Sequence, residues 1–207
     1  AGEFLVFITQ DAKPASPEWL YHLVQACDAS ADVAGAFGPH IAHPGARLVT
    51  ARELAEHFAG FGAEQSVVRI EDRARFDAEP GYRQFLHFFS NNNSCLRRSV
   101  WEHLPFPEVA FAEDQTWALA AVKAGYGKAF APQAAVYHSH DFGVWETLQR
   151  NFDEARSFQL YFGYDMQRSV VRAWVSAASL ARRDARWLRQ AGLRGARWLK
   201  NAAYMAC

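Results

Sequence analysis

Apolar residues in the first part of the chain form short runs separated by amphipathic stretches. The runs Phe4–Ile8 and Val33–Phe37 each hold about five residues between polar, glycine or proline signals, which is typical of buried strands. A helix is predicted between them, because a cap residue and a proline precede apolar residues at helical spacing. The residues concerned are Ser16, Pro17, Leu20, Leu23, Val24 and Cys27.

The same patterns continue to about residue 140, with a loop-rich stretch from 40 to 80. They predict a short helix at 50–61, a strand at 82–89, a short helix at 96–104, a longer helix at 113–125 and a last strand at 128–138. Strands that alternate with helices predict an α/β domain.

The first strand begins only three residues into the chain, and position 1 is not Met. A wholly apolar strand is usually buried on both faces, with neighbours on either side in a parallel sheet. We therefore expect that the chain starts in the middle of a domain and that Phe4–Ile8 forms an exposed edge prone to association.

Composition favours a folded, enzyme-like protein, since 50% of the residues are hydrophobic and 14% are aromatic. No apolar run approaches the roughly 18 residues of a membrane span, and no signal peptide is visible. The cysteines Cys27, Cys95 and Cys207 are odd in number and lack metal-ligand spacing. A reduced, cytoplasmic setting is therefore expected.

The zero net charge combines an acidic body with a basic tail. Residues 1–150 hold 12 Lys and Arg against 18 Asp and Glu, whereas 151–207 hold 10 against 4. We therefore predict a catalytic domain at 1–150 and a basic helical tail at 151–207.

The tail combines apolar and basic residues in one helical pattern. The apolar positions are Val171, Trp174, Val175, Ala178 and Ala181, and the basic ones are Arg168, Arg172, Arg182, Arg183, Arg186 and Arg189. The 165–200 helices could contact an anionic membrane surface, or pack on the body with a solvated arginine face. Nucleic-acid binding is disfavoured, because no recognisable module accompanies the arginines.

Two candidate sites follow predicted strands. Gln10 and Asp11 lie where the first strand ends, and ligands of open α/β sheets bind beyond carboxyl ends of strands. Asp11 could hold a metal there, or cap a turn. The run Asn91 to Ser94 could bind sugar hydroxyls, or be an ordinary loop in which Asn93 or Ser94 caps a helix.

Glu113 and Asp114 open a predicted helix, where the helix dipole stabilises negative charge. An ionised carboxylate there could act as a general base, or simply favour the helix end.

His138 and His140 lie two residues apart after the last strand, so both could face one site. Together with Asp141 they could form a hydrolase metal site, although the further ligands such sites need are not evident, or they could be structural. The other histidines, at 22, 40, 43, 57, 87 and 103, show no such grouping.

The order of these motifs is more specific than any one of them. The stretches "TQDA", "FSNNNSCLRRSVWEHLPFPEVAFAEDQTWA" and "AVYHSHDF" resemble family 2 glycosyltransferases, and more narrowly the bacterial rhamnosyltransferases among them. The resemblance spans residues 3 to about 155. It implies a partial GT-A fold, with 1–150 as the C-terminal portion of the catalytic domain and the N-terminal nucleotide-binding part absent.

The resemblance also implies roles for particular residues. Asp114 matches the catalytic base with Glu113 beside it, and Asp11 takes the place of the metal-binding Asp-x-Asp motif, here followed by Ala12 and Lys13. His138 matches a histidine that helps to hold the metal, Mg²⁺ or Mn²⁺, with His140 the second candidate. The expected substrate-binding residues are Gln10, Asn91, Asn93, Ser94 and Trp117.

The implied reaction is inverting transfer of a sugar, rhamnose by the closest resemblance, from a donor such as dTDP-rhamnose to a polysaccharide or lipid-linked acceptor. It would occur in the cytoplasm at the inner face of the plasma membrane, without nucleic acid. We expect the chain by itself to be inactive. The alternatives are the metal-dependent hydrolase and a non-catalytic sugar-binding module.

Overall fold

The computed structural model describes residues 2–164, 169–190 and 192. Contacts divide the chain into two compact units. The sheet unit comprises residues 1–44 and 53–139, and the helical unit comprises residues 45–52 and 140–207. The division along the chain thus falls at residue 139, and one short earlier segment is grouped with the helical unit.

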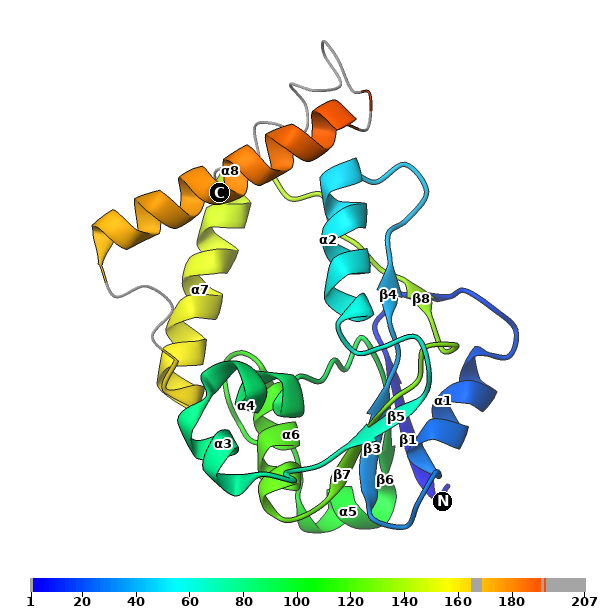
Figure 1. The fold of residues 1–207 in the computed structure, drawn as a ribbon. Helices are drawn as coiled ribbons and strands as arrows, with labels where there is room; N and C mark the ends of the chain where they lie inside the picture. The colour runs from blue at the N-terminus through cyan, green and yellow to red at the C-terminus, as the bar shows by residue number, and fades with distance from the viewer. Residues whose placement is uncertain (1, 165–168, 191, 193–207) are drawn as a thin grey trace. The chain divides into compact units, whose positions relative to one another are not determined.

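The sheet unit is built on a mixed five-stranded sheet (Figure 1). In spatial order its strands are β1 (Phe4–Ile8), β6 (Asn93–Arg97), β3 (Val33–Phe37), β7 (Gly127–Phe130) and β5 (Ser66–Val68). Only β3 and β7 run parallel, and the other neighbours are antiparallel. A smaller sheet joins β2 (Lys13–Pro14), β8 (Val136–Tyr137) and β4 (His40–Ile41).

Helices of the sheet unit lie on both faces of the large sheet (Figure 1). They are α1 (Trp19–Cys27), α3 (Arg73–Ala78), α4 (Pro80–His87), α5 (Arg98–His103) and α6 (Glu113–Lys123), with the end of α2 (Leu48–Ala59). One core packs α1 on the sheet through Leu23, Ala26 and Cys27. The other packs Trp117 and Ala121 of α6 on the opposite face.

The predicted strands at 4–8 and 33–37 and the helix at 113–125 are confirmed within two residues at their ends. The edge position predicted for Phe4–Ile8 is confirmed, although its neighbour in the sheet is antiparallel and not parallel. Among the described residues β1 pairs with β6 alone, in antiparallel fashion. Val6 and Ile8 are 38% and 41% exposed, since an edge strand has a neighbouring strand on one side only.

The strand predicted at 82–89 is wrong, because these residues belong mostly to α4. Glu79 is its cap residue and Pro80 its first residue, a position that proline favours. The apolar residues at 82, 85, 86 and 89 suit the spacing of a helix face as well as that of a short strand.

The structure also corrects three other elements. Asn93 and Ser94 belong to β6 and are not helix caps. The predicted strand at 128–138 is split into β7 and β8, which belong to different sheets. Helix α1 begins at Trp19, so Pro17 precedes the helix instead of opening it, and Leu20 is 47% exposed.

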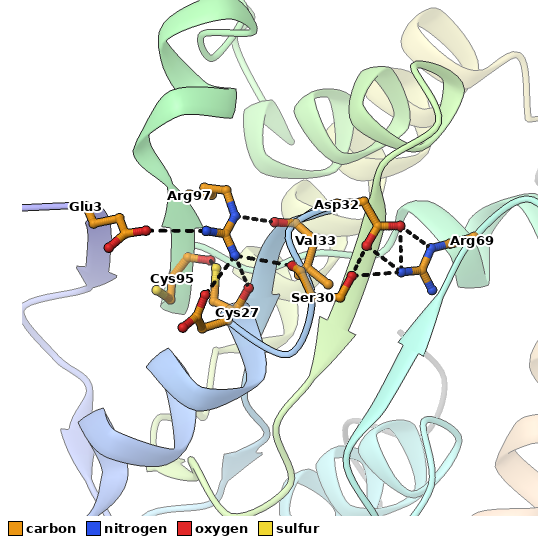
Figure 2. Close-up of polar contacts among 9 residues, drawn as sticks. Glu3, Cys27, Ser30, Asp32, Val33, Arg69, Cys95 and Arg97 are labelled. Carbon is orange, nitrogen blue, oxygen red and sulfur yellow. Dashed lines mark hydrogen bonds and ion pairs between the residues drawn. The ribbon is translucent and has the colours of Figure 1, made fainter.

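A buried arginine ties α1, β3 and β6 together at the end of the sheet where Phe4 pairs with Arg97 (Figure 2). The Arg97 guanidinium donates to the carbonyl oxygens of Cys27, Ser30 and Val33 at 3.1–3.2 Å. It also pairs with Asp28 at 3.1 Å. One of these acceptors is the carbonyl of Cys27, the last residue of α1, where a cation is favoured.

At the opposite end, a buried amide joins α1 to the loop after β7. Asn93 is 0% exposed, and its Oδ1 accepts from Trp19 Nε1 at 2.7 Å. Its Nδ2 donates to the carbonyl oxygen of Ala134 at 2.7 Å. Gly38 lies against this junction and donates its N–H to the Asn93 carbonyl.

The helical unit contains α7 (Val144–Phe162), α8 (Val170–Gln190) and the first turn of α2. Asp184 of α8 pairs with Arg52 at 2.6 Å, both side chains being buried, and Arg52 lies over the ring of Trp187. Residues 165–168, Arg168 included, and most residues after 190 lie outside the described part of the chain. Within that part, no helix is both long and apolar enough to cross a membrane.

Gly38→Ala should destabilise the protein, because a Cβ there would lie 2.5 Å from Asn93 Nδ2 and even closer to the Ala134 carbonyl. Overpacking of this kind costs about 1–3 kcal/mol, and backbone atoms cannot turn aside as a long side chain can. We expect the free energy of unfolding from urea titration to fall by at least about 2 kcal/mol. Gly81→Ala is the control, since its Cβ would meet open space; equal stabilities for the two variants would contradict the tight junction.

Candidate active site

The strand register brings several chemically active residues to one edge of the sheet. Ile8 of β1 lies beside Asn93, where β6 begins. Phe37 of β3 lies beside both Ser94 and Phe130. The segments that extend beyond these ends carry Asp11, Asn91 and His40, so three separate parts of the chain meet there.

Asp11 and His138 form a pair at this edge, with Asp11 Oδ2 3.5 Å from His138 Nε2. Asp11 follows β1, and His138 follows β8 and donates its backbone N–H to Ile41 of β4. The small sheet thus brings the histidine to the aspartate. A carboxylate and an imidazole are both metal ligands, and two protein ligands leave positions free for phosphate oxygens.

His40 extends this pair into the protein interior. Its ring centroid lies 5.0 Å from that of His138, and its Nε2 lies 3.4 Å from Ser90 Oγ. Burial, and to a smaller extent the nearby His138 and His57, lower the pKa of His40 to about 3. His40 is therefore neutral near pH 7. Through His138 and His40, contacts run from Asp11 to Ser90, in the turn before β6.

Asp114 belongs to the first turn of helix α6 and contacts the residues before β6 through Asn91. Its Oδ2 accepts from the backbone N–H of Asn91 at 3.0 Å, and its Oδ1 accepts from the backbone N–H of Gln115 at 2.7 Å. Burial raises the pKa of Asp114 to about 6, with the charge of Glu113 also raising it and the backbone hydrogen bonds opposing the rise. Such a carboxyl is mostly ionised at pH 7 yet is a stronger base than an ordinary aspartate.

The start of α6 is conformationally strained beside Asp114. Ala112 has φ 57° and ψ 39°, a left-handed conformation that costs a residue with a Cβ about 1–2 kcal/mol. Its carbonyl accepts from both the N–H and the Oγ1 of Thr116, which holds the helix start in place. Strained backbone is frequent at functional sites, where the surrounding structure enforces it.

The predicted substrate-binding residues divide by accessibility. Asn93, Ser94 and Trp117 are at most 1% exposed. The Asn93 amide is bonded at both ends, and Trp117 Nε1 donates to the Leu104 carbonyl. Structural roles suit these three residues better than ligand contact. Gln10 is exposed and Asn91 is half-buried, so both can reach a ligand.

His140 and Asp141 belong to the helical unit. The Asp141 carboxylate accepts from the backbone N–H of Arg47 and from Thr50 Oγ1, at 2.8–3.2 Å. The His140 ring stacks on Phe142 with centroids 4.9 Å apart. Asp141 is thus occupied in holding the start of α2, which disfavours it as a ligand of a hydrolytic metal.

Sequence reasoning did not single out His40 or Ser90. His40 was one histidine among several without grouping, although its place just after Gly38-Pro39 at the end of a predicted strand was a usable signal. Ser90 directly precedes the Asn run. The contact between His40 and Ser90 could not be read from the sequence, since 50 residues separate them.

Curated relatives indicate the kind of protein to which this edge belongs. Over 156 residues the chain is 33% identical to the O-antigen chain rhamnosyltransferase RfbN of Salmonella typhimurium. It is 32% identical to the O-antigen chain rhamnosyltransferase WbaN of Salmonella anatum over the same length. The chain is a homologue of rhamnosyltransferases. No protein-family model matches it.

This similarity to rhamnosyltransferases covers 73% of the chain and 46% of each relative. The chain therefore spans about half the length of the curated relatives it matches. The resemblance inferred from the motifs is confirmed at the level of homology, whereas the roles of Asp11, Asp114 and His138 stay predictions.

The Asp114 carboxyl should titrate with a midpoint near pH 6, against about 3.9 for an unperturbed aspartate, because burial disfavours its charge. Carboxyl ¹³C chemical shifts followed from pH 3 to 8 would measure this. Glu113→Gln should lower the midpoint, since it removes a nearby negative charge. Glu102→Gln, at an exposed position of α5, should not change it. A midpoint near 4 in the unmodified chain would contradict the buried environment.

Mn²⁺ should bind at the Asp11–His138 pair more strongly than Mg²⁺, because imidazole is a ligand of transition metals and rarely of Mg²⁺. Paramagnetic broadening of the backbone amide signals of Ala12 and Ser139, next to the pair in sequence, during a Mn²⁺ titration would measure it. Asp11→Asn and His138→Gln should each abolish the broadening. His43→Gln, whose ring stacks on Tyr137, serves as the control. Equal broadening in all three variants would show that the ion binds elsewhere.

Proposed function

We propose that this chain carries the catalytic base and the metal ligands of an inverting family 2 glycosyltransferase with the GT-A fold. The reaction transfers rhamnose from a nucleoside diphosphate donor, dTDP-rhamnose, to a polysaccharide or lipid-linked acceptor. The single observation that supports it best is the half-buried Asp114, with its raised pKa, at the same sheet edge as the Asp11–His138 pair. The named activity of the homologues provides the sugar.

Asp114 acts as the general base in this proposal. It removes the proton from an acceptor hydroxyl, whose oxygen then attacks the anomeric carbon while the bond to the diphosphate breaks on the opposite side. One displacement of this kind inverts the anomeric configuration. The Asn91 N–H fixes one carboxylate oxygen, and Glu113 helps to keep the pKa of Asp114 high.

Asp11 and His138 would hold the divalent cation, Mn²⁺ or Mg²⁺. When bound, the cation neutralises the negative charge that develops on the leaving diphosphate. His40, neutral and buried, packs edge-on against His138 and restricts the orientation of its ring. Gln10, exposed beside Asp11, is available to contact the donor.

The proposed location is the cytoplasmic face of the plasma membrane, with α8 as the contact. Its apolar side chains Val171, Trp174 and Val175 are 65–72% exposed. Arg182, Arg186 and Arg189 follow on the same outward face and are also exposed. An exposed apolar stripe continued by arginines suits an anionic lipid surface.

Asp114→Asn should slow transfer strongly, because an amide cannot take the proton from the acceptor hydroxyl. The rate of dTDP-rhamnose turnover, measured in the gene product that carries these residues, should fall about 10²–10⁴-fold. Donor affinity should stay within about twofold, since general-base loss does not remove a donor contact. Glu108→Gln, at an exposed carboxylate outside the site, is the control. Full turnover in Asp114→Asn would refute the assigned role.

A further inference from the structure

A pocket of the sheet unit lies between the end of α2 and α4. Its volume is about 250 Å³. It is lined by His57, Gly60, Phe61, Gly81, Gln84, Phe85 and Phe88. Ligand pockets for drug-sized molecules are about 300–1,000 Å³, so this one suits a single ring rather than an extended ligand.

Three phenylalanines form the apolar wall of the pocket. Phe61 and Phe85 stack with centroids 5.3 Å apart and planes at 16°. Phe88 lies 5.1 Å from Phe61 and 4.5 Å from the ring of His57. The pocket thus offers aromatic faces to a flat ligand, and electron-rich ring faces attract weakly positive C–H groups.

A buried lysine holds this wall in place. Lys128 is 3% exposed, and its Nζ donates to the carbonyl oxygens of Phe85 and Phe88 at 2.7 and 2.8 Å. The same Nζ lies 5.4–5.6 Å from the ring centroids of Phe61 and Phe85. The contacts fix the backbone of two lining residues, so the pocket is formed before any ligand arrives.

Two polar side chains complete the lining. Gln84 is half-buried and His57 is exposed, and within the described residues no hydrogen bond is found for either side chain. An amide supplies donors and an acceptor, and an imidazole supplies one of each. Hydroxyl groups around the rim of a ring would satisfy them.

Two short series of contacts connect the pocket to the candidate active site. Phe88 ends α4 and lies three residues before Asn91, whose N–H donates to Asp114. Phe58 packs against Phe88 and also against His40, the neighbour of His138. The rings of Phe58 and His40 thus link the pocket to His138, and the segment from Phe88 to Asn91 links it to Asp114.

We infer that this pocket binds a pyranose ring of the acceptor saccharide, with its C–H face on Phe61, Phe85 and Phe88 and its hydroxyls on His57 and Gln84. The inference rests on the proposed function for the identity of the saccharide as the acceptor. The lining decides the class: aromatic faces alone would suit any flat apolar ring, and the polar pair selects one edged with hydroxyls.

The test uses methyl α-L-rhamnopyranoside, with dTMP as a second probe, in an NMR titration of this chain. The glycoside should shift the Gln84 side-chain amide and the His57 ring signals with millimolar affinity. Gly81→Leu should weaken that binding at least tenfold, since it fills the open pocket rim without removing a core side chain. Gln84→Leu should also weaken it, through loss of the amide. Ser99→Leu, which places the same bulk on exposed α5, is the matched control and should leave affinity unchanged.

Shifts that persist in Gly81→Leu, or shifts at these residues from dTMP and none from the glycoside, would overturn the sugar assignment. Thermal unfolding of each variant separates a blocked pocket from a misfolded chain. The two proposals fail separately. If the glycoside binds and Gly81→Leu and Gln84→Leu weaken that binding, but the gene product has no transferase activity, the sugar pocket stands and the proposed function fails. Transfer that is unaffected by Gly81→Leu does the reverse.

Discussion

Asn93, whose side-chain amide is buried, joins three segments at one edge of the sheet. The amide accepts from Trp19 on α1 and donates to the Ala134 carbonyl after β7, and the backbone carbonyl of Asn93 accepts from the N–H of Gly38 after β3. A buried amide left without partners would cost about 1–3 kcal/mol. Separating any one of these segments would therefore destabilise the edge of the sheet that carries the site. Gly38 is required because no Cβ fits beside the junction.

The residues just before Asn93 convert this rigidity into a site. The turn from Ser90 to Asn91 contacts His40 on one side and Asp114 on the other. The proposed metal ligands and the proposed base therefore share one support, although they come from distant parts of the chain. Burial near this support disfavours the charged form of both groups, so it lowers the pKa of His40 and raises that of Asp114.

The same physical arrangement recurs in the aromatic pocket. Lys128 forgoes a carboxylate partner among the described residues and instead donates to two carbonyls at the end of α4. Burying an ammonium group is costly. The two hydrogen bonds and the nearby ring faces of Phe37, Phe61 and Phe85 offset that cost. Buried polar groups therefore support both places: Asn93 at the candidate site and Lys128 at the pocket.

Local patterns in the sequence were enough to predict β1, β3 and α6, because each depends on the periodicity of its own residues. The order of the motifs was enough to indicate a rhamnosyltransferase homologue and to name Asp11, Asp114 and His138. Only the tertiary structure decided that residues 80–87 form a helix, since their apolar spacing suits two periods. It also decided that β6 inserts between β1 and β3, which buries Asn93, Ser94 and Trp117, and that residues 57–61 meet 81–88 in a pocket. Those outcomes depend on pairing between distant segments, whose energies no local pattern encodes.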